Sequence, residues 1–213
     1  MRKASSFYWH DYETFGLGRA GAFPAQFAGR RTDLDCNPLG EGEVIYCRPG
    51  RDTLPSPESC ILTGILPQYC EEKGLLEGRF AAEVLQRLSC PGTVGIGYNT
   101  MAFDDEVTRF LLWRNFLPPY DREFMNGCGR WDLYPVVLAL WALRPEGIAW
   151  PKWRECSAAL AAKRLLPLEE RDPESFCFKL ECLTEANGIS HEKAHDAMSD
   201  VEGPIGLARL IRE

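Results

Sequence analysis

The chain has 213 residues, of which 45% are hydrophobic and 26% charged, a composition that excludes a disordered chain and is typical of a folded protein. This length suffices for one sizeable domain, and we expect a single domain over residues 1–213. The net charge of −7 argues against a protein that coats nucleic acid through bulk basicity, but it leaves room for an enzyme that grips a few nucleotides locally.

The nine cysteines are scattered along the chain and contain no C-x-x-C pair, so neither a zinc ribbon nor a thiol-redox motif is predicted. The sequence also has no apolar run long enough to span a membrane and no start typical of a signal peptide. We therefore expect a soluble cytoplasmic protein in which most of the cysteines serve as small buried hydrophobic side chains.

The first half of the chain predicts a meander of strands and then a helix. Strands are expected at 5–14, 25–33 and 42–49, where strand-forming residues lie between turn residues, and their short connections make them antiparallel. Residues 75–89 have helical periodicity, and the apolar run 93–99 is typical of a short strand.

The second half predicts helices at 103–117, 131–143, 176–187 and from about Asp196 to the C-terminus. Pro135 falls in the first turn of its helix, where proline is tolerated. Strands followed by alternating helices and strands predict a mixed α/β domain with helices packed on the sheet.

Two carboxylates share a face of the first strand with large aromatic side chains. Because alternate residues of a strand point the same way, Phe7, Trp9, Asp11 and Glu13 lie on one side. Either the strand end emerges into solvent, or the two acidic groups, about 7 Å apart, hold a cation between them. Ligation by oxygen atoms alone suits Mg²⁺ or Mn²⁺ rather than zinc.

Two further acidic residues lie on apolar helix faces. Asp104 shares a face with Val107 and Leu111, and it is either an N-cap or a ligand, with Asp105 as the alternative cap. Asp200 lies on an apolar stripe of the last helix, where a carboxylate is costly unless it is paired or binds metal. We therefore favour a functional role for Asp200.

The stretch His191-Glu192-Lys193-Ala194-His195 fits the H-E-x-x-H pattern of zinc proteases, while His195 and Asp200 form an H-x4-D pair. The protease pattern requires one continuous helix that carries both histidines. Here Gly188 is expected to end one helix and Asp196 to cap the next, so the pattern falls in the connector. The protease interpretation is therefore disfavoured.

Four stretches taken together resemble the DEDDh exonuclease superfamily: HDYETFG, GYNTMAFDDEVTRF, RWDL and AHDAMSD. Within it the chain is most similar to the catalytic domains of the bacterial exonuclease I family, to which PAQFA, ILTGILPQ and ALRPEGIAWP also correspond. The resemblance covers nearly the whole chain. It implies a ribonuclease-H-like fold and 3′→5′ exonuclease activity on single-stranded DNA.

The resemblance also implies the roles of individual residues. Asp11, Glu13, Asp104 and Asp200 would bind two Mg²⁺ ions, for which Mn²⁺ would substitute, and His195 would be the general base. The implied substrate-binding residues are Thr14, Phe15, Leu62, Thr63, Gly64, Asn99 and Phe103. Leu62–Gly64 would form a loop that presses on the last base, a contact that tolerates any base.

Three features depart from the family pattern. Its members carry further domains after this region, which bears on processivity. The stretch at about 152–174 is longer than the usual connector and predicts an added helix or a solvated insert. Pro204 cannot donate to the carbonyl of Asp200, which predicts a kink in the last helix.

Alternatives remain at this stage. An exoribonuclease or oligoribonuclease of the same superfamily would use the same catalytic residues, since contacts to a 2′-hydroxyl are not visible in sequence. A module that binds 3′ ends without cutting them would be expected to lack one of the carboxylates. The partner expected is the 3′ end of single-stranded DNA, with no membrane, and the protein is expected to be a monomer.

Overall fold

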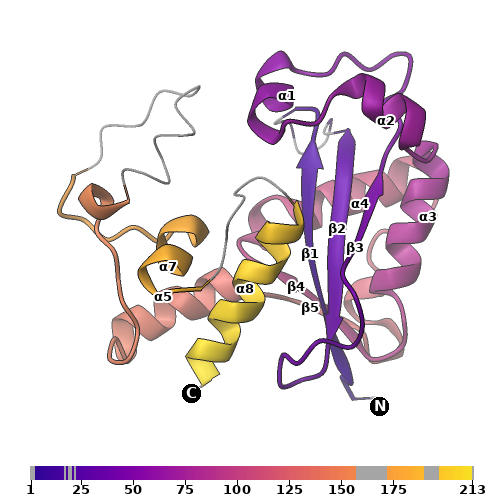
Figure 1. The fold of residues 1–213 in the computed structure, drawn as a ribbon. Helices are drawn as coiled ribbons and strands as arrows, with labels where there is room; N and C mark the ends of the chain where they lie inside the picture. Colours follow the sequence, from indigo (N-terminus) through magenta and orange to yellow (C-terminus); the bar gives the residue numbers. More distant parts are fainter. Residues whose placement is uncertain are drawn as a thin grey trace.

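The computed structural model describes residues 3–16, 18, 21, 23–156, 172–189 and 197–212. In this part of the chain a five-stranded sheet is flanked by helices on both faces (Figure 1). None of the described helices is long and apolar enough to cross a membrane. Most of the predicted insert at 152–174 and the whole segment with His191 and His195 lie outside the described residues.

The sheet combines antiparallel and parallel pairing around its central strand. Its strands are β1 (Ser6–Thr14), β2 (Pro24–Thr32), β3 (Glu43–Tyr46), β4 (Thr93–Gly97) and β5 (Gly129–Asp132). Their order is β3-β2-β1-β4-β5, with antiparallel pairs from β3 to β1 and parallel pairs from β1 to β5. This confirms the predicted mixed sheet of three antiparallel strands followed by shorter parallel ones.

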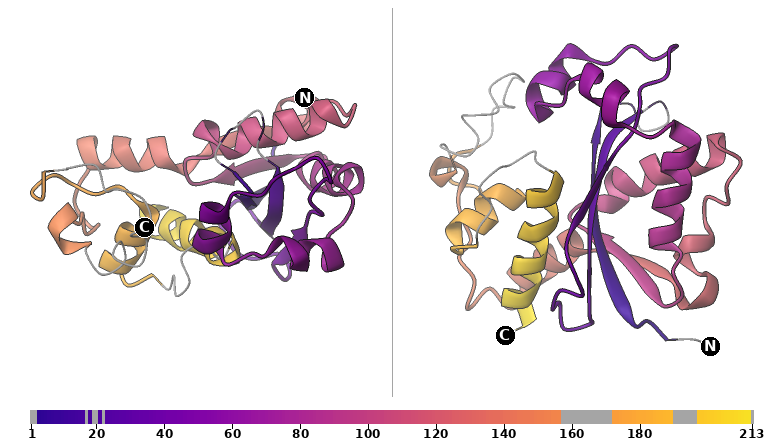
Figure 2. Two further views of the ribbon diagram at one scale, coloured as in Figure 1. Left: turned by 90° about the horizontal axis from the view of Figure 1, so that it is seen from above. Right: turned by 45° about the vertical axis from the view of Figure 1, so that its right-hand side comes forward.

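Seven helices are described, and they cover both faces of the sheet. They are α1 (Pro57–Thr63), α2 (Pro67–Lys73), α3 (Glu77–Leu88), α4 (Asp104–Arg114), α5 (Leu133–Leu143), α7 (Leu180–Ala186) and α8 (Ala197–Arg212). The right-hand view of Figure 2 shows α8, with α7 beside it, on one face and α3 with α4 on the other.

The residues of β1 alternate between two hydrophobic cores. Trp9 is buried in a core that includes Val201 and Leu207 of α8, and Phe7 packs against the same core. Tyr8 and Tyr12 are buried in the opposite core with residues of α3 and α4. The alternation predicted from sequence is therefore confirmed, and Asp11 and Glu13 lie on the α8 side of the strand.

Helix α8 presents small and apolar side chains to β1 and β2, which brings its first turn, with Asp200, against the sheet. Ala197, Val201, Ile205 and Ala208 are buried on this side. The helix continues as one element across Gly203 and the buried Pro204 (Figure 1). The missing N–H of Pro204 therefore does not end the helix, because the burial of this face holds both halves in place.

Two predicted helices begin later than expected. Trp131 and Asp132 belong to β5, and the Asp132 side chain caps α5 by accepting a hydrogen bond from the backbone N–H of Tyr134. Residues 176–179 are not part of α7, because this segment pairs with an earlier one: the backbone N–H of Cys177 donates to the carbonyl of Pro151 at 2.8 Å. In both cases tertiary pairing competes with helical periodicity and wins.

Helices α1 and α2 were not predicted. Each begins with a proline at its first position, and the Ser56 side chain caps α1. Gly64 ends α1 with a φ of 71°, a backbone conformation that favours glycine. The predicted Leu62–Gly64 loop is therefore wrong as a loop: Leu62 and Thr63 form the last turn of α1.

Candidate active site

Three carboxylates meet where β1 and α8 lie against each other. Asp11, Glu13 and Asp200 each offer an oxygen within 4.8 Å of the others. Glu13 is buried, while Asp11 and Asp200 are partly buried. The strand places the first two on one face by its two-residue period, and the packing of α8 supplies the third. Residues expected from sequence to act together are thus brought together by the fold.

Asp104 lies beside this cluster, at the start of α4. Its carboxylate accepts a hydrogen bond from the backbone N–H of Tyr12 at 3.1 Å, which ties α4 to the strand that carries Asp11 and Glu13. It is the first residue of the helix, and Phe103 holds the N-cap position without a side-chain cap. N-capping by Asp104 or by Asp105 is therefore wrong.

Asp105 has a structural role of its own. Its carboxylate pairs with Arg122 at 2.8 Å and with Arg130 at 2.9 Å, and both Asp105 and Arg122 are almost fully buried. These partners hold the pKa of Asp105 below its usual range in spite of its burial. Asp105 is thus neutralised by arginines, whereas the adjacent Asp104 acts on the carboxylate of Asp11.

The carboxylates repel one another in the absence of a cation. Burial, and then the charges of Asp104, Asp200 and Glu13, raise the pKa of Asp11 well above its usual range. Burial raises the pKa of Asp104 to about 8, against the opposing effect of backbone hydrogen bonds. Hard divalent cations bind such oxygen-only sets and remove this repulsion, so the donors present fit Mg²⁺ or Mn²⁺.

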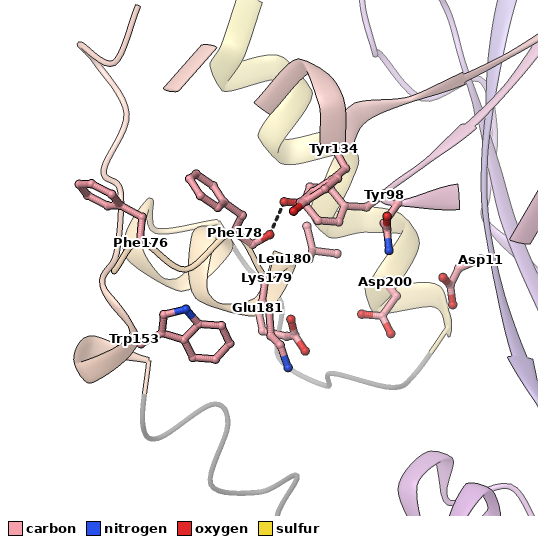
Figure 3. A pocket seen from close by; sticks show the side chains of 11 residues that line it. Asp11, Tyr98, Tyr134, Trp153, Phe176, Phe178, Lys179, Leu180, Glu181 and Asp200 are labelled. Carbon is pink, nitrogen blue, oxygen red and sulfur yellow. Dashed lines mark hydrogen bonds between the residues drawn. The ribbon is translucent and has the colours of Figure 1, made fainter. Parts of the chain in front are cut away.

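A pocket of about 510 Å³ opens beside the carboxylates (Figure 3). It is lined by Asp11, Tyr98, Asn99, Tyr134, Trp153, Phe176, Phe178, Lys179, Leu180, Glu181 and Asp200. Figure 3 shows Asp11 and Asp200 at one end of the pocket, Trp153 and Phe176 at the other, and Lys179 between them. A ligand that fits it therefore meets carboxylates at one end and aromatic rings at the other.

Asp132 organises one wall of the pocket. Its carboxylate accepts hydrogen bonds from the backbone N–H groups of Asn99 at 2.8 Å and Met101 at 3.0 Å, as well as from Tyr134. Asn99 has a φ of 62°, a left-handed conformation that asparagine tolerates better than most residues. The wall also contains Tyr98, whose hydroxyl donates to the carbonyl of Phe178 at 2.5 Å.

Most of the predicted substrate residues are not part of the lining of this pocket. The Phe15 side chain is buried in a small cluster with Ala25 and Cys70, and the Thr14 hydroxyl donates to the carbonyl of Gly16 at 2.7 Å. The ring of Phe103 packs against the core on the opposite side of the sheet. Asn99 is the predicted substrate residue that lines the pocket.

The segment Leu62–Gly64 is tied to the end of β1. The backbone N–H of Ser56, which caps α1, donates to the carbonyl of Phe15 at 2.8 Å, and Cys60 and Ile65 pack against the cluster around Phe15. The Thr63 hydroxyl donates to the carbonyl of Ser59, so it stabilises the helix end. The structure thus fixes α1 to the same strand end as the carboxylates.

Sequence reasoning missed Asp132 and the aromatic and charged residues of the pocket wall. Asp132 was placed inside a predicted helix, although Asp directly before an apolar helical run is a recognisable capping signal. Trp153, Phe176 and Lys179 carry no comparable signal, because the pairing that gathers them at the pocket is tertiary. His195 lies outside the described residues, so its role as general base stays a prediction.

Known proteins are similar to this chain in both sequence and fold. Exodeoxyribonuclease I of Haemophilus influenzae is 47% identical over 213 residues, which is all of this chain and 41% of that protein. Two solved structures of Escherichia coli exonuclease I, the zinc-bound form with single-stranded DNA and the complex with a dA16 oligonucleotide, match with TM-scores of 0.86 and 0.87 at 44% and 45% identity. They cover 99% and 98% of this chain, and 41% of each solved chain.

The chain therefore spans about two fifths of the length of these relatives. The likeness covers the sheet and its helices and identifies the fold as ribonuclease-H-like. The exonuclease family is metal-dependent, and Asp11, Glu13 and Asp200 form a group that could hold a metal ion. The exonuclease family model (RNase_T) matches residues 8–205, most of the chain, and this protein therefore belongs to the exonuclease family.

Proposed function

We propose that this protein is a 3′→5′ exonuclease that releases mononucleotides from single-stranded DNA by phosphodiester hydrolysis. The observation that carries the proposal is the group of carboxylates from β1 and α8 at the mouth of a pocket of nucleotide size. The mutual repulsion of these carboxylates is characteristic of a cation site rather than of a surface cluster.

The proposed metal ligands are Asp11, Glu13, Asp104 and Asp200, and the proposed cofactor is Mg²⁺, with Mn²⁺ as a substitute. When bound, two such cations neutralise the scissile phosphate, activate water and stabilise the leaving 3′-oxygen. The zinc named with the Escherichia coli enzyme belongs to that structure; oxygen-only ligands in this chain favour the harder Mg²⁺.

The chain's own groups orient the substrate and move a proton. His195, five positions before Asp200, is the proposed general base, since an imidazole takes a proton close to neutral pH. Asp104 is held on β1 by the Tyr12 N–H, which keeps its carboxylate aligned with Asp11. Asn99 and the aromatic residues of the pocket would hold the terminal nucleotide by hydrogen bonding and stacking.

The other proposed substrate residues act from the strand end. Thr14 and Phe15 would contribute backbone groups, since their side chains are engaged elsewhere. Leu62, Thr63 and Gly64 would press on the last base from the end of α1, and Phe103 would support the pocket from behind. Contact of this kind depends on the shape and the π-face of the base, which suits an enzyme indifferent to sequence.

The proposed partner is the 3′ end of single-stranded DNA, by analogy with the oligonucleotide complexes of the Escherichia coli relative. We propose a monomer in the cytoplasm, where a reducing environment keeps thiols free, and the nine cysteines here are all free. One domain over residues 1–213 is proposed as the catalytic unit, with an insert at about 152–174.

The test is a 5′-labelled oligonucleotide offered as single-stranded DNA, duplex DNA and RNA, with Mg²⁺ or with EDTA. The proposal predicts a ladder that shortens from the 3′ end of single-stranded DNA, requires Mg²⁺ and is absent with Asp11→Ala protein. A preference for RNA would instead indicate an exoribonuclease of the same family. Binding without cleavage under every condition would indicate a module that recognises 3′ ends.

A further inference from the structure

A second cluster of metal-binding side chains lies apart from the carboxylates. Cys156, Cys177 and Cys182 are each at most 2% exposed, and their sulfur atoms all lie within 4.8 Å of one another. They form a small buried cluster of their own, against which the ring of Trp153 packs. None of them has a disulfide partner.

The three thiols come from separate segments that meet here. Cys156 follows the 3-10 turn η4 (Trp153–Glu155), Cys177 precedes α7 and Cys182 lies within α7. The segments that carry Cys156 and Cys177 are joined by an antiparallel bridge between Lys152 and Phe176. A group bound to all three sulfurs would therefore fasten this strap, residues 151–156 and 173–177, to α7.

We propose that Cys156, Cys177 and Cys182 bind one Zn²⁺ ion as a structural site. Zn–S bonds of about 2.3 Å in tetrahedral geometry place sulfur atoms about 3.8 Å apart, so the cluster is close to the spacing that ligation requires. Clustered buried cysteines in a reducing compartment bind metal more often than they form disulfides. The fourth position is open to water or to one further side chain.

Polar groups beside the thiols can orient a metal-bound sulfur and offset its charge. The backbone N–H of Lys179 donates to Cys177, the kind of outer contact that orients metal-bound sulfur. The ammonium of Lys179, which lies 5.6 Å from the centre of the Trp153 ring, offsets part of the negative charge of a three-thiolate site.

This site is independent of the proposed nuclease chemistry but adjoins its pocket. Trp153 packs against the thiols and also lines the pocket, and Phe176 lines it from the other side of the strap. Zinc at the thiols would therefore hold the aromatic end of the pocket in place. The carboxylates at the opposite end would keep their own cation, since thiolates select zinc and carboxylates select Mg²⁺.

The experiment measures metal content and thermal stability of the 213-residue chain produced with zinc and purified without chelator. We expect about one zinc per chain, loss of that zinc in Cys156→Ser and Cys182→Ser proteins, and a midpoint of unfolding lower by roughly 10 °C without it. Cys128→Ser is the matched control, because Cys128 is also buried and its thiol donates to a main-chain carbonyl at 3.3 Å, as that of Cys156 does.

Cobalt substitution identifies the ligands and does not depend on activity. Co²⁺ bound to these thiolates gives an intense sulfur-to-cobalt charge-transfer band with the visible spectrum of four-coordination; cobalt at the carboxylates gives no such band. The band should be present in wild-type and Asp11→Asn proteins. Zinc-free wild-type protein, a disulfide between two of the three cysteines, or a band that survives in Cys182→Ser protein would each overturn the proposal. Should a serine variant aggregate, the wild-type zinc content and cobalt spectrum still decide.

Discussion

Asp11 is the residue on which the other carboxylates act: burial, and then the charges of Asp104, Asp200 and Glu13, raise its pKa in the metal-free protein. The arrangement is unfavourable for stability and useful for binding a cation, as is common where a site is built for function. Replacing Asp11 should therefore have opposite effects on the two: higher stability of the metal-free protein and weaker binding of the cation.

We predict that Asp11→Asn lowers exonuclease activity by more than about 10³-fold, because several kcal/mol of charge stabilisation are lost. The same change should raise the midpoint of thermal unfolding of the metal-free protein, since an amide does not have to be held protonated above its ordinary pKa as Asp11 is. Asp52→Asn, at an exposed position, should alter neither quantity. An active Asp11→Asn enzyme would contradict the assignment.

Asp132 illustrates a different role at the same scale, because its carboxylate holds the backbone of Asn99 and Met101. Asp132→Ala leaves three backbone N–H groups without their acceptor and should lower the free energy of unfolding by about 2–4 kcal/mol. The KM for oligonucleotides should rise about tenfold, with a smaller change in kcat. Asp132→Asn, which keeps one acceptor oxygen, should fall in between; equal behaviour of the two variants would argue against this role.

At the scale of elements, a buried ion-pair network fixes the start of α4. Asp105 pairs with Arg122 in the 3-10 turn η2 (Asp121–Glu123) and with Arg130 in β5, so three elements meet at one carboxylate. This network also helps to position Asp104. Asp105 pairs with the two arginines, while the neighbouring carboxylate of Asp104 accepts a hydrogen bond from the backbone of Tyr12 in β1.

We predict that Arg122→Met destabilises the protein by about 3–5 kcal/mol, measured by chemical denaturation, because it leaves a buried carboxylate short of a partner. Arg212→Met is the comparison: Arg212 pairs with Asp35 at the surface, and its loss should cost less than about 1 kcal/mol. Similar costs for both changes would show that the buried pair contributes no more than a surface pair.

Elements also show what could be predicted from sequence. The two-residue period of β1 fixed the faces of Asp11 and Glu13, and helical spacing placed Asp104 and Asp200 on apolar faces. Strand β5 could not be predicted from the sequence pattern, because its residues form a strand by pairing with β4. The cysteine cluster could not be predicted for the same reason: Cys156 is distant in sequence from Cys177 and Cys182, and tertiary pairing at Lys152 brings it to them.

At the scale of the whole molecule, the carboxylates make stability depend on pH and on metal. The folded state holds the proton of Asp104 until about pH 8, whereas the unfolded chain releases it near its ordinary value of 3.8. Between these values the folded state binds more protons, so the stability of the metal-free protein should fall as pH rises.

We predict that Asp104→Asn removes part of this fall, by about 1.4 kcal/mol per pH unit within the window, in denaturation measured with EDTA between pH 5 and pH 8. Taking the difference from wild type cancels the other titrating groups. Saturating Mg²⁺ should flatten the wild-type profile. Parallel profiles for the two metal-free proteins would refute the raised pKa of Asp104.

The central claim is that the carboxylates of β1 and α8 are the metal centre of a 3′→5′ exonuclease. Its most direct test is a Mn²⁺ titration in which bound metal, by electron paramagnetic resonance, and single-turnover cleavage of 5′-labelled single-stranded DNA are measured on the same samples. We predict that cleavage rises with the occupancy of the site and that Asp11→Asn loses both together. Cleavage that proceeds without bound Mn²⁺, or that persists when Asp11→Asn has abolished binding, would contradict the account.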